Sequence, residues 1–395
     1  MSPNQYGFMK GLSTECAVLK MVEYLYEALN AKTITLNVFI DFRKAFDLVD
    51  HGILLQKLQA YGFRGPILSV LTSYLSERKQ VVKIGNCFSA PKSVSMGIPQ
   101  GSCLGPLLFL IFINDLPKFS NMSTTILYAD DTALLFQNSN LNDLVSIVNS
   151  ELTRFSDWST ANKLIVNTEK TYPLLITNSR LPETVPPIYL NNDAIHFKTQ
   201  IKYLGVIVDQ NLKFNIHISE ICKKISKSIG ILYNMRKYLP LPALISLYYS
   251  LVYPYFIYCN LCWGNTYETH LKPLFILQKR AIRIIHQASF NSHTNSLFYS
   301  SKILKLPDIN RFNQCIYVFK NFDKFETVSH NYSVRNQFQL VPRFQRTTLT
   351  QHSISFSAPK EYNALPDSLK YSTSLSVFKR GVRNHLISLY NTSQS

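Results

Sequence analysis

The sequence lacks the features that mark secreted and zinc-binding proteins. Residues 1–10 are polar and contain no apolar run of the kind a signal peptide requires, which predicts a protein that is not secreted. The cysteines number seven, an odd count, and are scattered, a pattern typical of a reducing compartment. Cys259 and Cys262 have the spacing of metal ligands, but no second pair follows them. We therefore expect two buried thiols and no structural zinc.

Acidic residues are also scarce, and the shortage is uneven along the chain. There are 24 Asp and Glu against 41 Lys and Arg, a net charge of +17 over 395 residues. Residues 1–180 carry 16 basic and 14 acidic side chains, whereas residues 181–395 carry 25 and 10. A basic half of this size is typical of a protein that binds nucleic acid. An anionic membrane surface is the competing partner, and composition alone does not separate the two.

Charge is absent from one stretch, residues 239–263, which is long enough to cross a bilayer. It contains three prolines, five tyrosines and Asn260. Interior tyrosines need hydrogen-bond partners, and a strong membrane span is richer in Leu and Val. We predict a core helix and a turn here, and no membrane as a partner.

Hydrophobic periodicity in the first half predicts alternating helices and strands. After a helix at 14–29, a buried strand at 33–42 is followed by helices at 52–61 and 66–76, short strands at 80–84 and 88–94, and a helix at 104–116. A hairpin of strands 124–128 and 132–137, a helix at 140–162 and a strand at 172–177 complete the unit. This order predicts an α+β fold, a split βαβ sheet with its helices on one face, over residues 30–180.

The second half of the chain differs from the first in composition and in hydrophobic pattern. A Pro-rich linker at 181–187 precedes small strands that end at 201–208, and the pattern then becomes helical and basic at 216–238, 241–258 and 270–286. The lysines of the first of these helices fit either a solvated face or a face turned toward phosphates. Residues 287–300 are rich in Ser and Asn and predict a loop or hinge. The final 90 residues predict a small α+β appendage.

Three aspartates carry the chemistry. Asp130 and Asp131 lie at the predicted hairpin tip, and Asp41 ends the predicted strand 33–42. Asp is common in turns, so an isolated Asp-Asp pair is usually structural. In a split βαβ sheet, however, the strand of Asp41 neighbours the hairpin, and the three acids can converge at one edge. Such a set suits two Mg²⁺ ions, and it predicts phosphoryl or nucleotidyl transfer.

Five motifs that contain these acids resemble motifs A to E of reverse transcriptases, in the same order and spacing. They are Phe-Ile-Asp-Phe-Arg-Lys-Ala-Phe-Asp at 39–47, Gly-Ile-Pro-Gln-Gly-Ser at 97–102, Tyr-Ala-Asp-Asp at 128–131, Asn-Thr-Glu-Lys-Thr at 167–171 and Tyr-Leu-Gly at 203–205. The flanking residues, among them Gly-Pro-Leu-Leu-Phe at 105–109, resemble the non-LTR retrotransposon (LINE-type) branch, near jockey and chicken-repeat elements. The resemblance continues into the tail, at Arg335-Asn336 and Asn363-Ala364-Leu365-Pro366, and so covers almost the whole chain.

The resemblance implies a right-hand polymerase fold in four parts. These are partial fingers and a split-βαβ palm at 1–180, a linker with primer-grip-like strands at 181–210, a helical thumb at 211–290, and a basic, family-specific C-terminal segment at 291–395. The implied activity is that of an RNA-directed DNA polymerase, which uses two Mg²⁺ ions, or Mn²⁺, to add dNTPs to a DNA primer on an RNA template. The implied location is intracellular, in the cytoplasm and nucleus.

The resemblance also implies roles for single residues. Asp41 and Asp130 hold the metals, with Asp131 as the weaker ligand, and Phe46 is a steric gate against a ribose 2′-hydroxyl. Gln100 and Gly101 support the nucleotide, Lys170 protonates the departing pyrophosphate, and Tyr203, Leu204 and Gly205 grip the primer. Taken singly, Phe46 is more often a core residue, Lys170 a solvated lysine and Gln100-Gly101 an ordinary turn. Asp47 and Asp50 are assigned to structure, as helix-capping acids.

The sequence departs from the family pattern on its N-terminal side. Relatives carry a fingers segment with an Arg-Pro-Ile-like motif before the stretch that corresponds to residues 5–8, and an endonuclease further upstream, and nothing here corresponds to either. Met9 stands where the family usually has Arg. Both differences remove positive charge expected near the nucleotide. The alternative hypothesis is therefore a truncated, catalytically weak or inactive retroelement remnant that binds nucleic acid.

Overall fold

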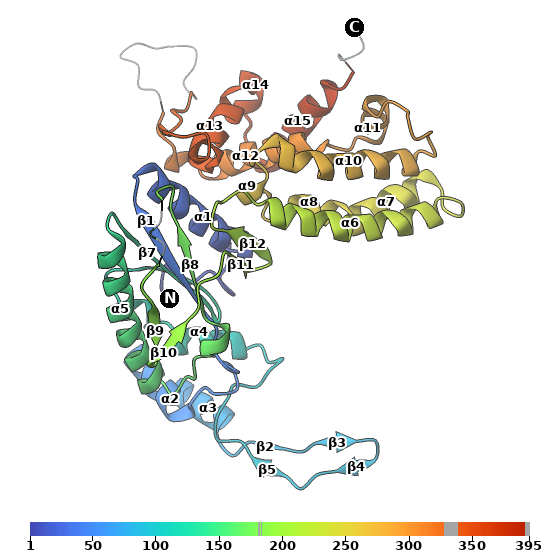
Figure 1. Cartoon of the computed structure of the whole chain (residues 1–395). Helices are drawn as coiled ribbons and strands as arrows, with labels where there is room; N and C mark the ends of the chain where they lie inside the picture. Colours follow the sequence, from blue (N-terminus) through green and yellow to red (C-terminus); the bar gives the residue numbers. More distant parts are fainter. Residues whose placement is uncertain (181, 183, 328–338, 392–395) are drawn as a thin grey trace. The chain divides into compact units, whose positions relative to one another are not determined.

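The computed structural model describes residues 1–180, 182, 184–327 and 339–391, so that Leu181 of the predicted linker and the Arg335-Asn336 motif lie outside it (Figure 1). The chain divides into two compact units. Unit 1 comprises Met1–Ala17 and Lys32–Leu204, and unit 2 comprises Val18–Ala31 and Gly205–Ser395. The boundary at Leu204 falls inside the predicted 181–210 segment, and residues 18–31 group with unit 2. The division into four functional parts stays a prediction.

A four-stranded antiparallel sheet forms the centre of unit 1, in the order β6-β7-β1-β8. Its strands are β1 (Ile34–Ile40), β6 (Thr124–Tyr128), β7 (Asp131–Asn138) and β8 (Tyr172–Ile176). All seven residues of β1 are buried, as a continuous apolar and β-branched run predicts for a central strand. Since β6 and β7 form a hairpin and β1 pairs with both β7 and β8, the predicted split βαβ sheet is confirmed.

Helices α2 (His51–Ala60), α3 (Gly65–Leu75), α4 (Gly105–Phe112) and α5 (Leu141–Ala161) pack with this sheet around one core. Side chains of β1 and β7 that point to the same face meet apolar residues of α4 and α5, among them Leu36, Val38, Leu134, Phe136, Phe109, Phe112, Val148, Leu152 and Phe155. Burial of this continuous apolar layer is the main force that holds the sheet and its helices together.

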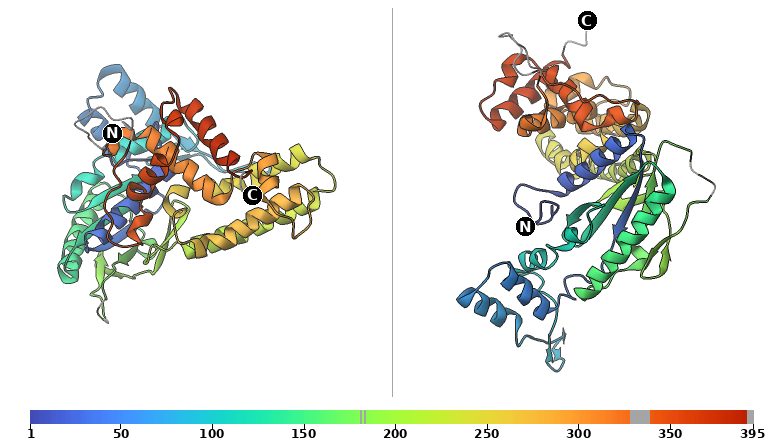
Figure 2. Two further views of the ribbon diagram at one scale, coloured as in Figure 1. Left: turned by 90° about the horizontal axis from the view of Figure 1, so that it is seen from above. Right: turned by 90° about the vertical axis from the view of Figure 1, so that its left-hand side faces the viewer.

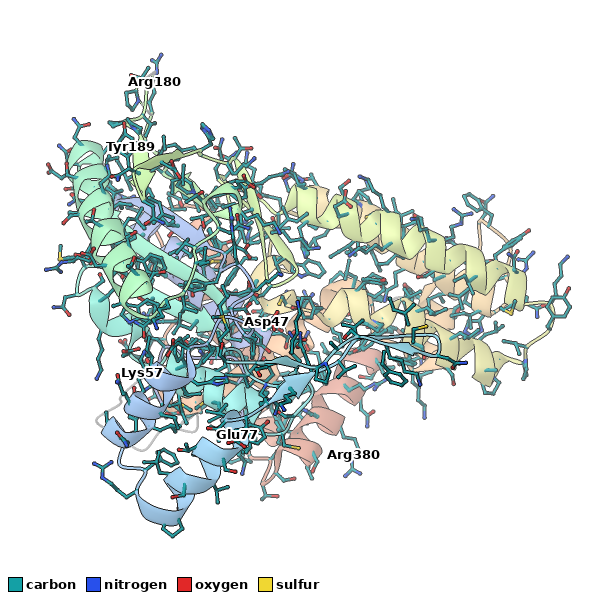
Figure 3. The ribbon with its side chains drawn as sticks, turned by 90° about the horizontal axis from the view of Figure 1, so that it is seen from below. Asp47, Lys57, Glu77, Arg180, Tyr189 and Arg380 are labelled. Atoms are coloured by element: carbon teal, nitrogen blue, oxygen red, sulfur yellow. The ribbon has the colours of Figure 1, made fainter. Side chains whose placement is uncertain are left out.

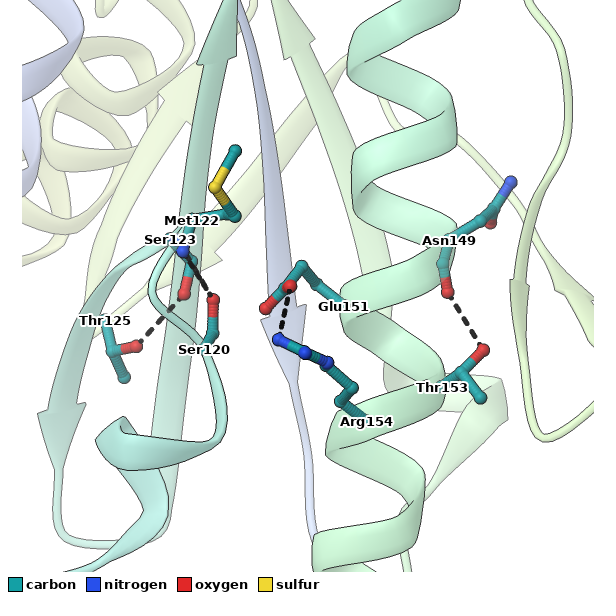
Figure 4. A network of polar contacts seen from close by, with 8 residues as sticks. All are labelled: Ser120, Met122, Ser123, Thr125, Asn149, Glu151, Thr153 and Arg154. Atoms are coloured by element: carbon teal, nitrogen blue, oxygen red, sulfur yellow. Dashed lines mark hydrogen bonds and ion pairs between the residues drawn. The ribbon is translucent and has the colours of Figure 1, made fainter.

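Local polar contacts fix where these elements begin. Asp50 caps α2, because its carboxylate accepts from the backbone N–H of Ile53 at 2.9 Å, and it also pairs with Lys163 at 2.7 Å. The capping role predicted for Asp50 is therefore confirmed, whereas Asp47 lies three residues before that cap and caps no helix. In the turn before β6, Ser120 Oγ accepts from the backbone N–H groups of Met122 and Ser123 at 3.1 and 3.0 Å (Figure 4).

Unit 1 also contains smaller strands. Two short ladders, β2 (Lys79–Gln80) with β5 (Lys92–Ser93) and β3 (Lys83–Ile84) with β4 (Cys87–Phe88), form a ribbon that extends away from the sheet (Figure 1). Strands β9 (Ile188–Leu190) and β10 (Asp193–Ile195) form a hairpin, and β11 (Gln200–Tyr203) ends the unit.

Unit 2 is helical in the part that the structure describes. Helix α1 (Thr14–Asn30) enters it at Val18, and β12 (Val206–Asp209) precedes its remaining helices. These are α6 (Asn215–Met235), α7 (Leu241–Leu251), α8 (Tyr253–Ile257), α9 (Asn260–Trp263), α10 (Glu268–Ile285), α11 (Asn295–Ser301), α12 (Leu306–Lys320), α13 (Ile354–Asn363), α14 (Asp367–Lys370) and α15 (Leu375–Ser388) (Figures 1 and 2). Helices α6 and α10 pack together, as do α12, α13 and α15.

Two predictions for unit 2 were wrong. The predicted loop at 287–300 contains the start of α11, and the final 90 residues, predicted to be α+β, form helices α12 to α15 in the part that the structure describes. The β pairing described beyond residue 300 is a single bridge between Thr327 and Leu340. The uncharged stretch 239–263 is divided among α7, α8 and α9, with Cys259 and Cys262 buried at the last of these. Over the described residues, no helix combines the length and apolarity needed to cross a membrane.

One half-buried carboxylate, that of Glu23, ties α1 to the C-terminal helices within unit 2. Glu23 accepts from the backbone N–H of Ile354 at 2.6 Å and from that of Ser355 at 3.2 Å, where α13 begins. Burial raises the pKa of Glu23 to about 7, and Glu27 adds to the rise, although the two backbone donors lower it. The carboxylate thus satisfies helix N–H groups that would otherwise have no acceptor.

This raised pKa predicts a pH-dependent stability. Folded Glu23 retains its proton up to about pH 7, whereas its ordinary pKa is 4.5, so the folded state binds the proton more tightly. We expect the free energy of unfolding to fall as pH rises from 4.5 to 7, by at most about 1.4 kcal/mol per pH unit, the limit for one proton. Urea unfolding at several pH values checks this, with Glu23→Gln losing that slope and Glu268→Gln, which changes an exposed acid on α10 of the same unit, retaining it. Parallel curves for wild type and Glu23→Gln would contradict the assignment.

Candidate active site

The strand register places three aspartates at one edge of the sheet. Tyr128 pairs with Asp131 across the β6-β7 hairpin, so that Ala129 and Asp130 form its two-residue turn. Ile40 pairs with Thr132, which puts Asp41, the residue after β1, beside the start of β7. The sheet therefore brings together the acids that the sequence placed 89 residues apart.

Electrostatics shows that these carboxylates interact. Loss of water around the carboxylate raises the pKa of Asp130, and Asp41 adds to the rise. Asp131 is exposed as a residue, yet partial desolvation, followed by repulsion from Asp130 and Asp41, raises its pKa to about 6. Like charges held this close favour either a proton or a cation among them.

The acids are neighbours rather than a closed set of ligands. Among the described residues, no three His, Cys, Asp or Glu side chains are grouped closely enough to hold a metal ion. The chemistry of the donor set nevertheless fits a hard divalent cation, because all three are carboxylates and two have pKa values raised by desolvation and, to a smaller extent, by the neighbouring acids.

Asp41 is held by the segment that follows α5. The Nδ2 group of buried Asn167 donates to Asp41 Oδ2 at 3.0 Å, and the backbone N–H of Asn167 donates to the Asp41 carbonyl at 2.8 Å. The Asp41 N–H donates to Thr171 Oγ1 at 3.4 Å, and that hydroxyl donates to the Asn167 carbonyl at 2.9 Å. These contacts fix both the backbone and the carboxylate of Asp41.

The turn that carries Asp130 is held from the N-terminal segment. Ala129 has a φ of 55°, in the left-handed region that residues with a Cβ seldom adopt. Gln5, only 3% exposed, accepts through Oε1 from the backbone N–H groups of Ala129 at 3.0 Å and Gly7 at 2.7 Å. Backbone bonds between Leu127 and its neighbours Asn4 and Tyr6, at 2.9 and 2.8 Å, run beside this contact. The segment thus stabilises a strained backbone at the turn.

The loop around Gln100 is joined to the residues after Asp41. Gln100 Nε2 donates to Asp47 Oδ1 at 2.9 Å, which is the contact Asp47 makes in place of a helix cap. Gly97 has a φ of 88°, and a Cβ there would lie 2.7 Å from the Asp47 carbonyl oxygen. Gly101 also has a positive φ, 79°, but open space around it. Glycine is required at Gly97 for space and φ, and at Gly101 for φ.

Phe46 and Lys170 differ in how firmly they are held. The Phe46 ring is half-buried and stacks on Phe109, with ring centroids 4.1 Å apart. Lys170 is exposed at the end of a short 3-10 helix, Thr168–Lys170, which follows Asn167. The ring is positioned by packing, whereas the lysine head group remains exposed to solvent.

The Tyr203-Leu204-Gly205 segment lies at the unit boundary. Tyr203 is buried and packs on Phe39 of β1, with ring centroids 5.2 Å apart. Burial raises the pKa of Tyr203, and the nearby Asp131 and Tyr6 add to the rise. Leu204 and Gly205 have positive φ values of 44° and 83°, as a tight turn requires. Tyr203 is thus close to the acids, within unit 1.

Sequence reasoning missed Gln5, Gly7, Asn167 and Thr171 as site residues. Gln5 and Ala129 are separated by 124 residues, and Asn167 and Asp41 by 126. For Asn167 and Thr171 the sequence offers one signal, because both residues lie inside the motif at 167–171. Nothing in residues 4–8 by themselves identifies a contact to the turn.

Comparisons with known proteins show what the whole chain is similar to. The family model described as reverse transcriptase (RNA-dependent DNA polymerase) matches residues 1–208. The chain is 32% identical over 292 residues to the probable RNA-directed DNA polymerase from transposon BS of Drosophila melanogaster, a match that covers 71% of this chain and 32% of that protein. It is 29% identical over 314 residues to the RNA-directed DNA polymerase from mobile element jockey of the same fly, covering 77% and 34%. The chain thus spans about a third of the length of these relatives.

Among solved structures, the chain is similar to apo telomerase from Candida tropicalis. The TM-score is 0.40 at 13% sequence identity, and the match covers 78% of this chain and 51% of the telomerase chain.

The contact of residues 4–8 with the acidic turn predicts a cost for a side chain at Gly7. A Cβ at Gly7 would overlap the Ala129 backbone nitrogen and lie 3.0 Å from the Tyr128 carbonyl carbon. We expect Gly7→Ala to lower the free energy of unfolding by about 1–3 kcal/mol, the usual cost of overpacking. We also expect faster hydrogen exchange in the peptide that contains Ala129.

A matched change at Gly230 controls for the substitution itself. Gly230 lies within α6, and a Cβ there meets nothing within 4 Å. Gly230→Ala should be neutral or slightly stabilising, because Ala is the better helix former. Equal behaviour of the two variants would show that residues 4–8 do not hold the turn.

Proposed function

This chain belongs to the reverse transcriptase (RNA-dependent DNA polymerase) family, and we propose that it adds dNTPs to the 3′ end of a DNA primer on an RNA template. Its similarity to the non-LTR retrotransposon enzymes jockey and BS extends through 71% of the chain or more. The single observation that carries the proposal is the placement of Asp41, Asp130 and Asp131 at one edge of the palm sheet, inside the region that the family model matches. We propose that the chain carries out this reaction inside the cell, in the cytoplasm and nucleus.

Reverse transcriptases generally use divalent metal ions, and we infer that Asp41, Asp130 and Asp131 hold two Mg²⁺, or Mn²⁺, in this chain. The raised pKa values of Asp130 and Asp131 support this, because a cation relieves the same repulsion that a proton relieves. When bound, such ions supply Lewis-acid stabilisation of charge on phosphate oxygens. Asn167 and Thr171 keep Asp41 oriented, and Gln5 keeps the turn of Asp130 in place.

The remaining residues bind and orient the substrates. The packed ring of Phe46 acts as the gate against a ribose 2′-hydroxyl, and Gln100 and Gly101 support the incoming nucleotide from a loop fixed to Asp47. The exposed ammonium of Lys170 donates a proton to the departing pyrophosphate. Tyr203, with Leu204 and Gly205, positions the primer end.

Removal of one acid tests the activity. The purified chain should extend an oligo(dT) primer on poly(A) in the presence of Mg²⁺ or Mn²⁺. Asp130→Asn should lower the extension rate by about 10³-fold, since loss of a metal ligand removes several kcal/mol of transition-state stabilisation. Asp143→Asn, which neutralises an exposed acid on α5 of the same unit, should extend at the wild-type rate.

The outcomes of this assay separate the proposal from its alternative. No extension by the wild-type chain across the range of Mg²⁺ and Mn²⁺, alongside salt-dependent binding of the primer–template, would identify a nucleic-acid-binding protein without polymerase activity. Extension that survives in Asp130→Asn would remove the acids from the mechanism.

The proposed role of the Phe46 ring as a steric gate predicts that a smaller side chain at this position lowers the selectivity for deoxyribose over ribose. Phe46→Val opens the space that the stacked ring fills, so we expect the ratio of kcat/KM for dTTP over UTP on poly(A) to fall by roughly 10- to 100-fold, the usual range for a steric pocket change. The kcat/KM for dTTP should change by only a few-fold, which controls for damage to the site. An unchanged ratio would assign Phe46 to the core alone.

A further inference from the structure

The proposed site makes no use of the ribbon formed by residues 79–93 of unit 1, the arm. Lys79 pairs with Ser93 and Gln80 with Lys92 near its base, and Lys83 pairs with Phe88 and Ile84 with Cys87 near its tip. Figures 1 and 2 show it leaving the body of the unit, and in Figure 3 the labelled Glu77 precedes it. Every residue from 79 to 93 is exposed.

Such a ribbon is poorly stabilised by its own contacts. An isolated two-stranded hairpin is marginally stable in water, because it buries little apolar surface. The arm instead exposes large apolar side chains, with Val82 at 57%, Ile84 at 77% and Phe88 at 67% exposure. Exposed apolar groups gathered on one element are typical of a binding surface.

Charge indicates the class of partner. From Arg78 to Asn114 the sequence has four basic residues, Arg78, Lys79, Lys83 and Lys92, and no acidic residue. All but Arg78 lie within the arm and are exposed. A surface with positive charge and no compensating acid is complementary to a polyanion.

The tip combines this charge with an aromatic ring. Lys83 and Phe88 lie opposite each other across the β3-β4 ladder, and Lys83 Nζ is 5.2 Å from the centre of the Phe88 ring. An exposed ring beside a cation suits an unpaired base on the ring and a phosphate at the ammonium. A protein partner would use the apolar residues but would leave the three lysines of the arm without acids, unless it were itself acidic.

We propose that the arm binds a single strand of nucleic acid, with a base stacked on Phe88 and phosphates paired with Lys79, Lys83 and Lys92. The inference rests on the proposed function for the nature of the polyanion. It assigns to the arm a second contact with the nucleic acid, separate from the acidic edge of the sheet. Single-stranded rather than duplex nucleic acid is favoured, because only unpaired bases present a free face for stacking.

Anisotropy of a fluorescent oligouridylate, bound by the full chain without metal or dNTP, tests this assignment. Phe88→Ala should weaken binding at least about fivefold, the lower range for loss of one stacked base. Lys83→Gln should lower the slope of log affinity against log salt by about 0.7, the value for one phosphate contact on a single strand. Lys118→Gln is the matched control, because it removes one exposed lysine from the same unit outside the arm. Binding by both arm variants that equals the control would overturn the proposal.

A second measurement locates the contact. Cys87 is exposed at the tip, next to Phe88, and its rate of alkylation should fall when wild-type chain is saturated with the oligonucleotide, relative to Cys16. An unchanged rate at Cys87 would overturn the proposal. Because Phe88 is mostly exposed, Phe88→Ala should retain the wild-type unfolding temperature.

The binding assay requires no catalysis, so its result is independent of primer extension. A chain that binds through the arm but does not extend a primer would contradict only the proposed function. A chain that extends primers while its arm variants bind normally would contradict only the arm.

Discussion

Repulsion among three carboxylates is the constraint that the core of unit 1 must offset. The antiparallel pairing of β1 with β7 holds Asp41 beside Asp130 and Asp131, although the charges favour separation. That arrangement persists because β1 is buried over its whole length and its apolar face is part of one core with α4 and α5. The free energy gained by burying this layer offsets the cost of gathering the acids.

The supporting contacts come from distant parts of the chain. Asn167 and Thr171 orient Asp41, and Gln5 accepts from the strained turn at Ala129. Each of these groups is buried or half-buried, so its hydrogen bonds form in a medium where an unpaired donor is costly. The backbone at the acids is therefore fixed, although the side chains are not grouped closely enough to hold a metal ion in the part of the chain that the structure describes.

The sheet and its acids could be predicted from the sequence because their signals are local. The apolar run that ends at Asp41 and the hairpin around Asp130 depend on residues within a few positions of each other. The helical tail could not, because its Ser-rich and Pro-containing segments resemble turns. Helix α13 contains Pro359 and begins where Glu23, more than 300 residues earlier, supplies acceptors for its first N–H groups. Gln5 was missed for the same reason, since its partner at Ala129 is defined only by the fold.

The loop that follows Asp41 and the loop that precedes α4 are hydrogen-bonded to each other, which affects how the site responds to substitutions in either loop. Gly97 N–H donates to the Val49 carbonyl at 2.8 Å, Ile98 N–H donates to the Phe46 carbonyl at 2.9 Å, and the Gly97 carbonyl accepts from His51 Nε2 at 2.8 Å. The backbone beneath Phe46 and the backbone that leads to Gln100 therefore behave as one body. Substitutions in the two loops should have non-additive effects, since each change is felt through bonds that the other loop shares. The sugar selection proposed for Phe46 and the nucleotide support proposed for Gln100 would therefore change together, because a substitution in one loop shifts the backbone of the other.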